Sequence, residues 1–231
     1  MEYLEALKFL FNFPRSRIGP GTDSTSKLLN YLGNPHMGNK YIQITGSNGK
    51  GSTSRMISSI LMESNPKVGL YTSPHLSDFR ERILINDQLI PYQSICDFVD
   101  IILPYTDTCE PNSPLPTFFE VTTALALWHF KNEGVDVAVI EVGIGGKHDA
   151  TSVITPIYSA VTNVSLEHTE ILGDTVEEIA RDKSSIKSEN SPLVTAATGA
   201  ALAEIKHEVT DLLTVGESGD FQVKYEGSSS S

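Results

Sequence analysis

Apolar residues follow two different spacings along the chain, and the two spacings alternate. Short, nearly continuous apolar segments, typical of strands buried on both faces of a sheet, occupy residues 41–45, 67–72, 135–142, 157–164 and 191–197. Apolar residues three or four positions apart predict helices, which we expect at residues 53–62, 92–103, 117–132 and 174–186, with an opening helix through Leu4, Leu7, Leu10 and Phe11. This alternation predicts an α/β fold whose mainly parallel sheet is flanked by helices.

The ends of two predicted helices carry clear local signals. Thr117 and Glu120 form a T-x-x-E capping box, so the helix start explains Glu120 and we assign it no chemistry. Gly134 stands just past the end of that helix, where glycine is favoured. Pro104 is expected to end the helix at 92–103, because proline lacks the backbone N–H that continues a helix.

Length and composition indicate a globular domain at residues 1–226 and a disordered Ser-rich tail at 227–231. The net charge of −12 argues against nucleic acid as a partner, because phosphate backbones would be repelled. The two cysteines, Cys96 and Cys109, have no C-x-x-C spacing, which argues against a zinc site or a disulfide scaffold. No apolar run approaches 18 residues and the N-terminus does not resemble a signal peptide. We therefore expect no membrane contact and a cytoplasmic location.

The segment TGSNGKGST at 45–53 lies between a predicted strand and a predicted helix. Its three glycines allow backbone N–H groups to surround a phosphate, and the helix N-terminus adds a favourable dipole. Lys50 can reach the outer phosphates, and the hydroxyl of Ser52 or Thr53 can face a metal ion. The match to the common phosphate-loop pattern is imperfect, because Ile44 replaces its first glycine and Gly51 follows the lysine. The alternative is a glycine-rich turn with a surface lysine.

Polar residues follow three other predicted strands, namely Ser73, Glu141 and His168. Because ligands bind at the carboxyl ends of parallel strands, we expect these three residues to converge near the loop. Glu141 closes an apolar run, where a carboxylate needs a metal ion or an ionic partner. Each also has a structural alternative: a salt-bridged glutamate, a hydrogen-bonded core histidine, and a Ser-Pro turn.

Lys183 breaks the polarity pattern of its helix. The apolar stripe of 174–186 runs through Val176, Ile179 and Ala180, and its next position is Lys183. A lysine buried there would have a lowered pKa and a nucleophilic amine. The alternative is that its side chain extends past the helix edge to solvent.

Several segments in order resemble the folylpolyglutamate synthase and dihydrofolate synthase family, a branch of the Mur ligases. The loop TGSNGKGST is close to the family's TGTNGKGST, and EVGIGGKHDATS at 141–152 is similar to its EVGLGGRLDATN. LGNP, TSPHL, RERI, TFFEVTTALAL and HTEILGDTVEEIARDKSSIK also match, so the resemblance covers about residues 1–225. It implies a P-loop NTPase-like fold, that of the Mur ligase central domain.

The resemblance also implies a reaction: ATP phosphorylates the carboxylate of dihydropteroate or folate, and L-glutamate attacks the acyl phosphate. It implies that ATP binds at Asn48, Gly49, Lys50, Gly51 and Ser52. Mg²⁺ would be held by Ser73, Glu141 and His168, and Lys183 would be carbamylated and help to hold a metal ion. His168 and Lys183 are thus the expected catalytic positions. A histidine is an unusual ligand for Mg²⁺, so its role rests on the resemblance.

The chain also departs from the family pattern. Lys147 and His148 replace Arg-Leu, Ser152 replaces Asn, Glu167 replaces Asp, and Ser184 and Ser185 replace Ala-Gly. Family members carry a further C-terminal domain, so this chain is expected to need such a domain or a partner chain for full activity. Another Mur-type ligase and a non-catalytic nucleotide-binding fragment or pseudoenzyme stay open as alternatives, as do the preferred folate substrate and the oligomeric state.

Overall fold

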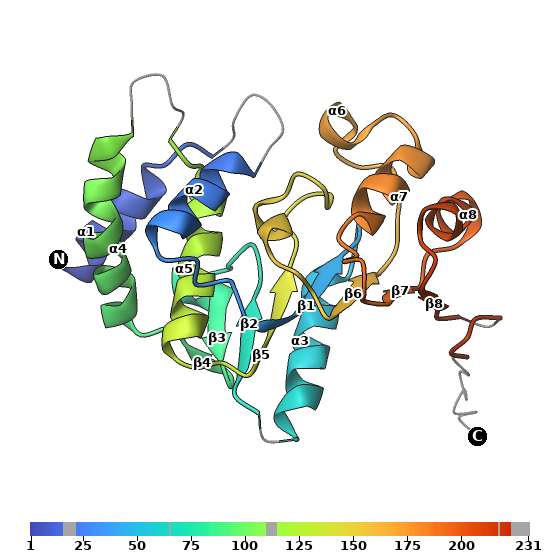
Figure 1. Ribbon diagram of the computed structural model, residues 1–231, viewed down its shortest axis with the longest axis horizontal. Helices are drawn as coiled ribbons and strands as arrows, with labels where there is room; N and C mark the ends of the chain where they lie inside the picture. Colours follow the sequence, from blue (N-terminus) through green and yellow to red (C-terminus); the bar gives the residue numbers. More distant parts are fainter. Residues whose placement is uncertain (16–21, 65, 110–114, 217, 223–231) are drawn as a thin grey trace, which may run out of the picture.

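The computed structural model describes residues 1–15, 22–64, 66–109, 115–216 and 218–222. Its centre is an eight-stranded sheet with the strand order β4-β3-β2-β5-β1-β6-β7-β8 (Figure 1). The pairings from β2 through β8 across the sheet are parallel, and β3 joins β2 and β4 in antiparallel fashion. The predicted α/β fold with a mainly parallel sheet is confirmed.

The strands are β1 (Lys40–Thr45), β2 (Val68–Tyr71), β3 (Ile83–Ile85), β4 (Gln88–Leu89), β5 (Val137–Glu141), β6 (Tyr158–Val161), β7 (Leu193–Thr195) and β8 (Leu212–Thr214). The α-helices are α1 (Tyr3–Phe11), α2 (Asp23–Tyr31), α3 (Lys50–Met62), α4 (Tyr92–Thr108), α5 (Phe118–Asn132), α6 (Thr169–Leu172), α7 (Val176–Ser184) and α8 (Gly199–Glu208). Two 3₁₀ turns, η1 (Phe79–Arg82) and η2 (Ala150–Val153), complete the described elements. Among the described helices, none combines the length and apolar character that crossing a bilayer requires.

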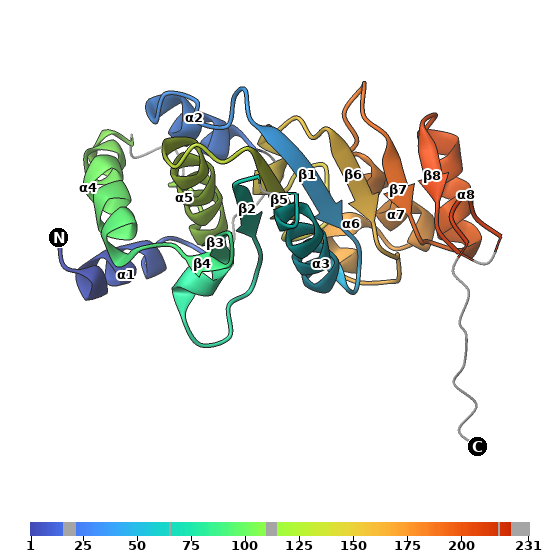
Figure 2. The ribbon, with the colours of Figure 1, turned by 90° about the horizontal axis from the view of Figure 1, so that it is seen from below.

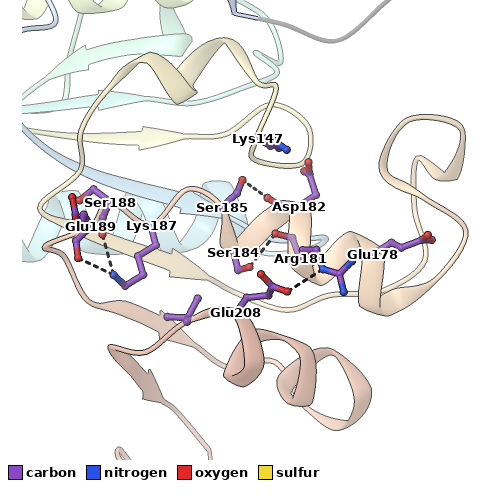
Figure 3. A pocket seen from close by; sticks show the side chains of 11 residues that line it. Lys147, Glu178, Arg181, Asp182, Ser184, Ser185, Lys187, Ser188, Glu189 and Glu208 are labelled. Carbon is purple, nitrogen blue, oxygen red and sulfur yellow. Dashed lines mark hydrogen bonds and ion pairs between the residues drawn. The ribbon is translucent and has the colours of Figure 1, made fainter.

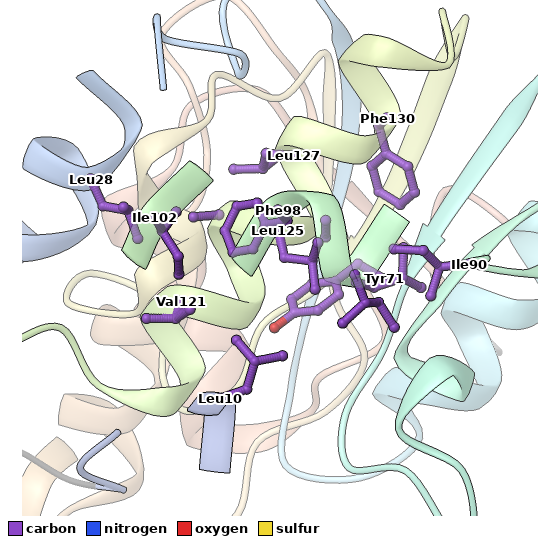
Figure 4. Packing of buried hydrophobic residues seen from close by; sticks show 14 of the residues in the cluster. Leu10, Leu28, Tyr71, Ile90, Phe98, Ile102, Val121, Leu125, Leu127 and Phe130 are labelled. Carbon is purple, nitrogen blue, oxygen red and sulfur yellow. The ribbon is translucent and has the colours of Figure 1, made fainter. Parts of the chain in front are cut away.

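Helices cover both faces of the sheet, which explains why β5 is apolar at four consecutive positions, Val137 to Ile140. In β5, Ala138 and Ile140 pack toward α4 and α5, whereas Val139 packs toward α3 on the opposite face. Figure 4 shows the larger cluster, where side chains of α1, α2, α4, α5 and β2 meet. In Figure 2, α3 crosses in front of β1 and β5.

Topology brings the carboxyl ends of β2, β5, β1 and β6 together at one edge, because these four strands are adjacent and parallel. Each of these strands is followed by a segment singled out from the sequence: Ser73 follows β2, Glu141 ends β5, the glycine-rich loop follows β1, and His168 lies beyond β6. The topology thus places Ser73, Glu141 and the loop at one sheet edge, whereas His168 lies seven residues beyond the end of β6.

Two expectations about the helices are wrong. Pro104 lies inside α4, which continues to Thr108. Packing outweighs the lost backbone hydrogen bond, because Tyr105 packs on the core and its ring lies 5.0 Å from that of Tyr31. Leu4 is 69% exposed, so the buried stripe of α1 runs through Ala6 and Leu10 instead. The tail at 227–231 lies outside the described residues.

Candidate functional site

The glycine-rich loop connects β1 to α3, as predicted, and the backbone geometry explains why two of its positions are glycine. Gly46 and Gly49 adopt φ values of 141° and 78°, which L side chains rarely tolerate. A Cβ on Gly46 would also collide with the side chain of Thr162. Helix α3 begins at Lys50, earlier than expected, so the first-turn amides of the helix belong to the loop itself. This is the arrangement that an anion-binding loop requires.

Lys50 lies against its own loop. Its Nζ donates to the carbonyl of Gly46 at 2.7 Å and to that of Ser47 at 3.4 Å. The ammonium group is thus held at the mouth of the loop, where a phosphate would meet both the lysine and the α3 N-terminus.

A segment after β6 fixes the shape of the loop, and the sequence reading did not identify it. The side-chain amide of Asn163 bonds both backbone polar groups of Asn48. The Asn163 Oδ1 accepts from the Asn48 backbone N–H at 3.0 Å, and the Asn163 Nδ2 donates to the Asn48 backbone carbonyl at 3.0 Å. Thr162 Oγ1 donates to the same carbonyl at 2.6 Å, and the Ser47 N–H donates to the Asn163 carbonyl. No sequence signal pointed to Asn163, because the predicted strand at 157–164 includes it, whereas β6 ends at Val161.

Glu141 is buried at the end of β5, at 4% exposure. Its carboxylate accepts the Ser73 N–H at 2.9 Å, and a Cβ on Gly51 would lie 3.4 Å from the carboxylate. The structure therefore brings Ser73, Glu141 and the loop together. Burial raises the pKa of Glu141, against the opposing influence of the Ser73 N–H, Lys50 and Arg82. Such a buried carboxylate oxygen is a ligand type that Mg²⁺ favours.

Lys183 is 1% exposed, as its place on the apolar stripe predicted, so the solvent-extended alternative is wrong. Its Nζ lies 2.8 Å from Oε1 of Glu167, a pairing that the sequence reading did not foresee. Burial lowers the pKa of Lys183, and the Glu167 carboxylate opposes this effect. Burial is the largest single influence and works to raise the pKa of Glu167, but the hydrogen bond and charge of Lys183, together with Ser47 and Lys50, act against it and the net change is downward.

His168 lies less closely in the site than Ser73 and Glu141. Its backbone is left-handed at φ 45°, its side chain is 45% exposed, and its Nδ1 lies 4.0 Å from Glu170 on α6. Within the described residues, no hydrogen bond or ion pair joins the imidazole to Glu141 or Lys50. The segment that carries it nevertheless begins with the Thr162–Asn163 contacts to the loop.

Asp149 organises the loop that follows Glu141. Its carboxylate accepts the backbone N–H groups of Gly143, Ile144 and Thr151 at 3.0 to 3.1 Å. A Cβ on Gly146 would collide with the backbone of α7, so this loop packs directly on the helix that carries Lys183. The glycines of the segment 143–146 thus allow the loop after β5 to pack closely against α7.

A pocket on the outer side of α7 contains none of the predicted site residues (Figure 3). Its central cation, Arg181, is already paired with Glu204 at 2.5 Å and Glu208 at 3.1 Å. The same acids and His207 form a group of potential metal ligands, but both carboxylates are already engaged by Arg181. We therefore place the site at the carboxyl edge of the sheet.

The chain is similar to a known protein family and to solved structures. The Mur ligase middle domain matches residues 44–228. A probable bifunctional folylpolyglutamate synthase/dihydropteroate synthase of Haloferax volcanii is 52% identical over 98% of this chain. An FPGS–AMPPCP–folate complex superposes with a TM-score of 0.88 at 38% identity over 93% of this chain, and E. coli FolC in complex with DHPP and ADP with a TM-score of 0.81 at 31% identity over 94%.

The chain spans only part of these relatives. It covers 28% of the Haloferax protein, 54% of the chain in the FPGS complex and 52% of the FolC chain.

Proposed function

The chain belongs to the Mur ligase family, in its folylpolyglutamate synthase and dihydrofolate synthase branch, and we propose that it is the ATP-binding part of a ligase that adds L-glutamate to dihydropteroate or folate. The observation that carries this proposal is the Lys50 loop, held at the sheet edge beside the buried carboxylate of Glu141. The complexes of relatives with AMPPCP, with ADP and with folate support it.

In the proposed reaction, a substrate carboxylate oxygen attacks the γ-phosphorus of ATP, and ADP leaves with the electron pair of the broken P–O bond. The glutamate amine then attacks the acyl carbon, loses a proton and expels phosphate. Residues Asn48 to Ser52 would hold the phosphates, with Lys50 supplying positive charge. The described residues contribute mainly binding and orientation, which can provide much of the rate enhancement.

Mg²⁺ fits the chemistry of the Glu141 surroundings, because a buried carboxylate and a serine hydroxyl are hard oxygen donors. We assign the metal to Ser73 and Glu141, with His168 as the third position by family resemblance. Bound Mg²⁺ would neutralise phosphate charge as it develops. Here Ser73 fixes Glu141 through its backbone N–H, and Gly51 leaves the space beside the carboxylate open.

We also propose that Lys183 is carbamylated in the active protein. Its burial favours the neutral amine that reacts with CO₂. A carbamate beside Glu167 would place two negative groups together, which a divalent cation would compensate. The pairing of Lys183 with Glu167 therefore describes the unmodified amine.

Calorimetric titration with Mg·ATP tests the proposed nucleotide site. Lys50→Ala is expected to weaken binding by about ten-fold or more, because it removes a charge-assisted contact to phosphate. Lys40→Ala is the matched control, since Lys40 is exposed at the start of β1 and its loss should leave the affinity unchanged. Equal affinity of the Lys50 variant and the native chain would refute the assignment of this loop.

A further inference from the structure

Arg82 is a buried cation at the same sheet edge, and none of the roles assigned above uses it. Only 7% of the residue is exposed. It ends the 3₁₀ turn η1, and its carbonyl accepts the N–H of Thr72, which ties η1 to the segment after β2. That segment continues through Ser73, whose N–H bonds Glu141. The chain path thus leads Arg82 to the edge where the loop and Glu141 meet.

The hydrogen-bond partners of the Arg82 guanidinium, His75 and Tyr71, are neutral, and Glu141 adds a negative charge at longer range. The Arg82 Nε donates to Nδ1 of His75 at 2.8 Å, so that nitrogen of the imidazole carries no proton. Across the described part of the chain, no carboxylate oxygen lies within 4.0 Å of an Arg82 side-chain nitrogen, so Arg82 forms no ion pair there. Arg80, two residues earlier, shows the contrast, because it pairs with Asp78 at 2.7 Å and lies over the ring of Tyr92. A buried guanidinium normally has an anionic partner.

The Phe118 ring lies beside the guanidinium and belongs to a larger group of aromatic rings. The Arg82 Cζ lies 5.3 Å from the centre of the Phe118 ring, which stacks on Phe11 at 5.3 Å. Phe79 and His75 lie 6.0 Å apart and also face this group of rings. Phe11 is 44% exposed, so the cluster reaches the surface. Stacked rings beside a guanidinium suit a planar aromatic group that carries a negative charge.

We propose that Arg82 binds the carboxylate of the aromatic acid substrate and that neutral His75 holds the guanidinium in orientation. This inference rests on the proposed function. The γ-phosphate of ATP could supply the same charge, but Lys50 and the loop already serve phosphate, and the rings around Arg82 favour an arene carboxylate. The contact would reduce repulsion between the carboxylate and the triphosphate while one carboxylate oxygen attacks phosphorus. That oxygen–phosphorus bond forms as the bond to ADP breaks, and no proton moves.

Calorimetry with two ligands tests the contact directly. Pteroate, which carries a 4-aminobenzoate carboxylate, and its carboxamide would be titrated into the chain saturated with Mg·AMPPCP. The native chain should prefer pteroate about ten- to a hundred-fold, as expected for hydrogen bonds to a charged group. In Arg82→Gln, both ligands should bind with the weak affinity of the carboxamide, whereas Arg80→Gln should retain the full preference.

Other outcomes separate the explanations. His75→Ala keeps the charge of Arg82 but removes its acceptor, so it should reduce the preference for pteroate without abolishing it. Equal binding of the two ligands to the native chain, or an undiminished preference in Arg82→Gln, overturns the inference; if Arg82→Gln does not fold, the native chain and His75→Ala decide it. A loss of AMPPCP affinity alone in Arg82→Gln would assign the guanidinium to phosphate. Failure of the native chain to bind AMPPCP would instead refute the proposed function.

Discussion

Asn163 holds the glycine-rich loop in shape, although the loop lies more than a hundred residues earlier in the chain. Its side-chain amide bonds the backbone N–H and carbonyl of Asn48. Asn163→Ala is expected to weaken Mg·ATP binding about ten-fold, because the loop must then be ordered at the expense of binding energy. Asn163→Asp should be worse, since it keeps the acceptor but places a carboxylate against the Asn48 carbonyl. Titration calorimetry measures both effects. Asn132→Ala, at the exposed end of α5, is the matched control, and an unaltered affinity in Asn163→Ala would contradict this role.

Glu141 illustrates the conflict between stability and binding at a single residue. Burial raises its pKa above the ordinary 4.5. Below pH 4.5 the carboxyl is protonated in both states, and the free energy of unfolding falls as the pH rises through the raised pKa of the folded chain. Glu141→Gln should therefore raise the melting temperature in EDTA at pH 7 and flatten its pH dependence, while weakening nucleotide binding in Mg²⁺.

Thermal unfolding between pH 4.5 and pH 8 measures this difference. Glu63→Gln is the control, because Glu63 is exposed at the end of α3 and its loss should leave the pH profile unchanged. A lower melting temperature of Glu141→Gln at pH 7 without metal would show that the carboxylate stabilises the fold.

The sequence allowed prediction of residues whose role depends on local position, and missed those whose role depends on distant partners. Lys50, Ser73 and Glu141 follow strands, and a parallel sheet brings strand ends together whatever the details of packing. Arg82 ends a short 3₁₀ turn and Asn163 lies in the loop after β6, so their contacts depend on how η1 and that loop fold back. The spacing of apolar residues along the sequence gives no information about such long-range contacts.

At the scale of elements, the sequence predicted both α7 and the burial of Lys183, because an amphipathic stripe shows which side of a helix is buried. The start of α7 was displaced by two positions, since Thr175 caps the helix through Glu178 and the expected helix began at Asp174. The strands were predicted longer than they are, because apolar residues continue into buried segments such as Val142. An apolar sequence shows that a segment is buried. Where a strand ends depends instead on the last residue that the adjacent strand pairs with.

The helix α7 also carries a testable expectation about Lys183. On addition of ¹³C-bicarbonate with Mg²⁺, a carbamate resonance should appear in the native chain and be absent from Lys183→Met, which keeps the apolar stripe filled. The variant should bind Mg·ATP within about three-fold of the native affinity, because the loop holds the phosphates independently. Lys187→Met, on the segment after α7, is the control and should retain the resonance. A native spectrum without the resonance would contradict carbamylation.

At the scale of the whole molecule, strand order decides which loops can cooperate. The glycine-rich loop leaves β1 at the centre of the sheet, so the segments after β5 and β6 are its two neighbours. One neighbour supplies Glu141 and the other supplies Asn163. The antiparallel strands β3 and β4 extend the opposite margin and bring η1, with Arg82, back beside β2. A single edge therefore combines the glycine-rich loop, a buried carboxylate and an additional cation.

The net charge of −12 has its own consequence for the folded chain. Self-repulsion destabilises a compact acidic protein, and salt screens it: the Debye length falls from about 30 Å at 0.01 M to about 8 Å at 0.15 M. Adding NaCl over this range should therefore raise the melting temperature at pH 7.5, even though it weakens local pairs such as Arg181 with Glu204. Near pH 4.9, the isoelectric point, the same addition should have little effect, because the net charge vanishes. A salt effect of equal size at both pH values would instead indicate that ions act through solvation of the surface rather than through screening of charge.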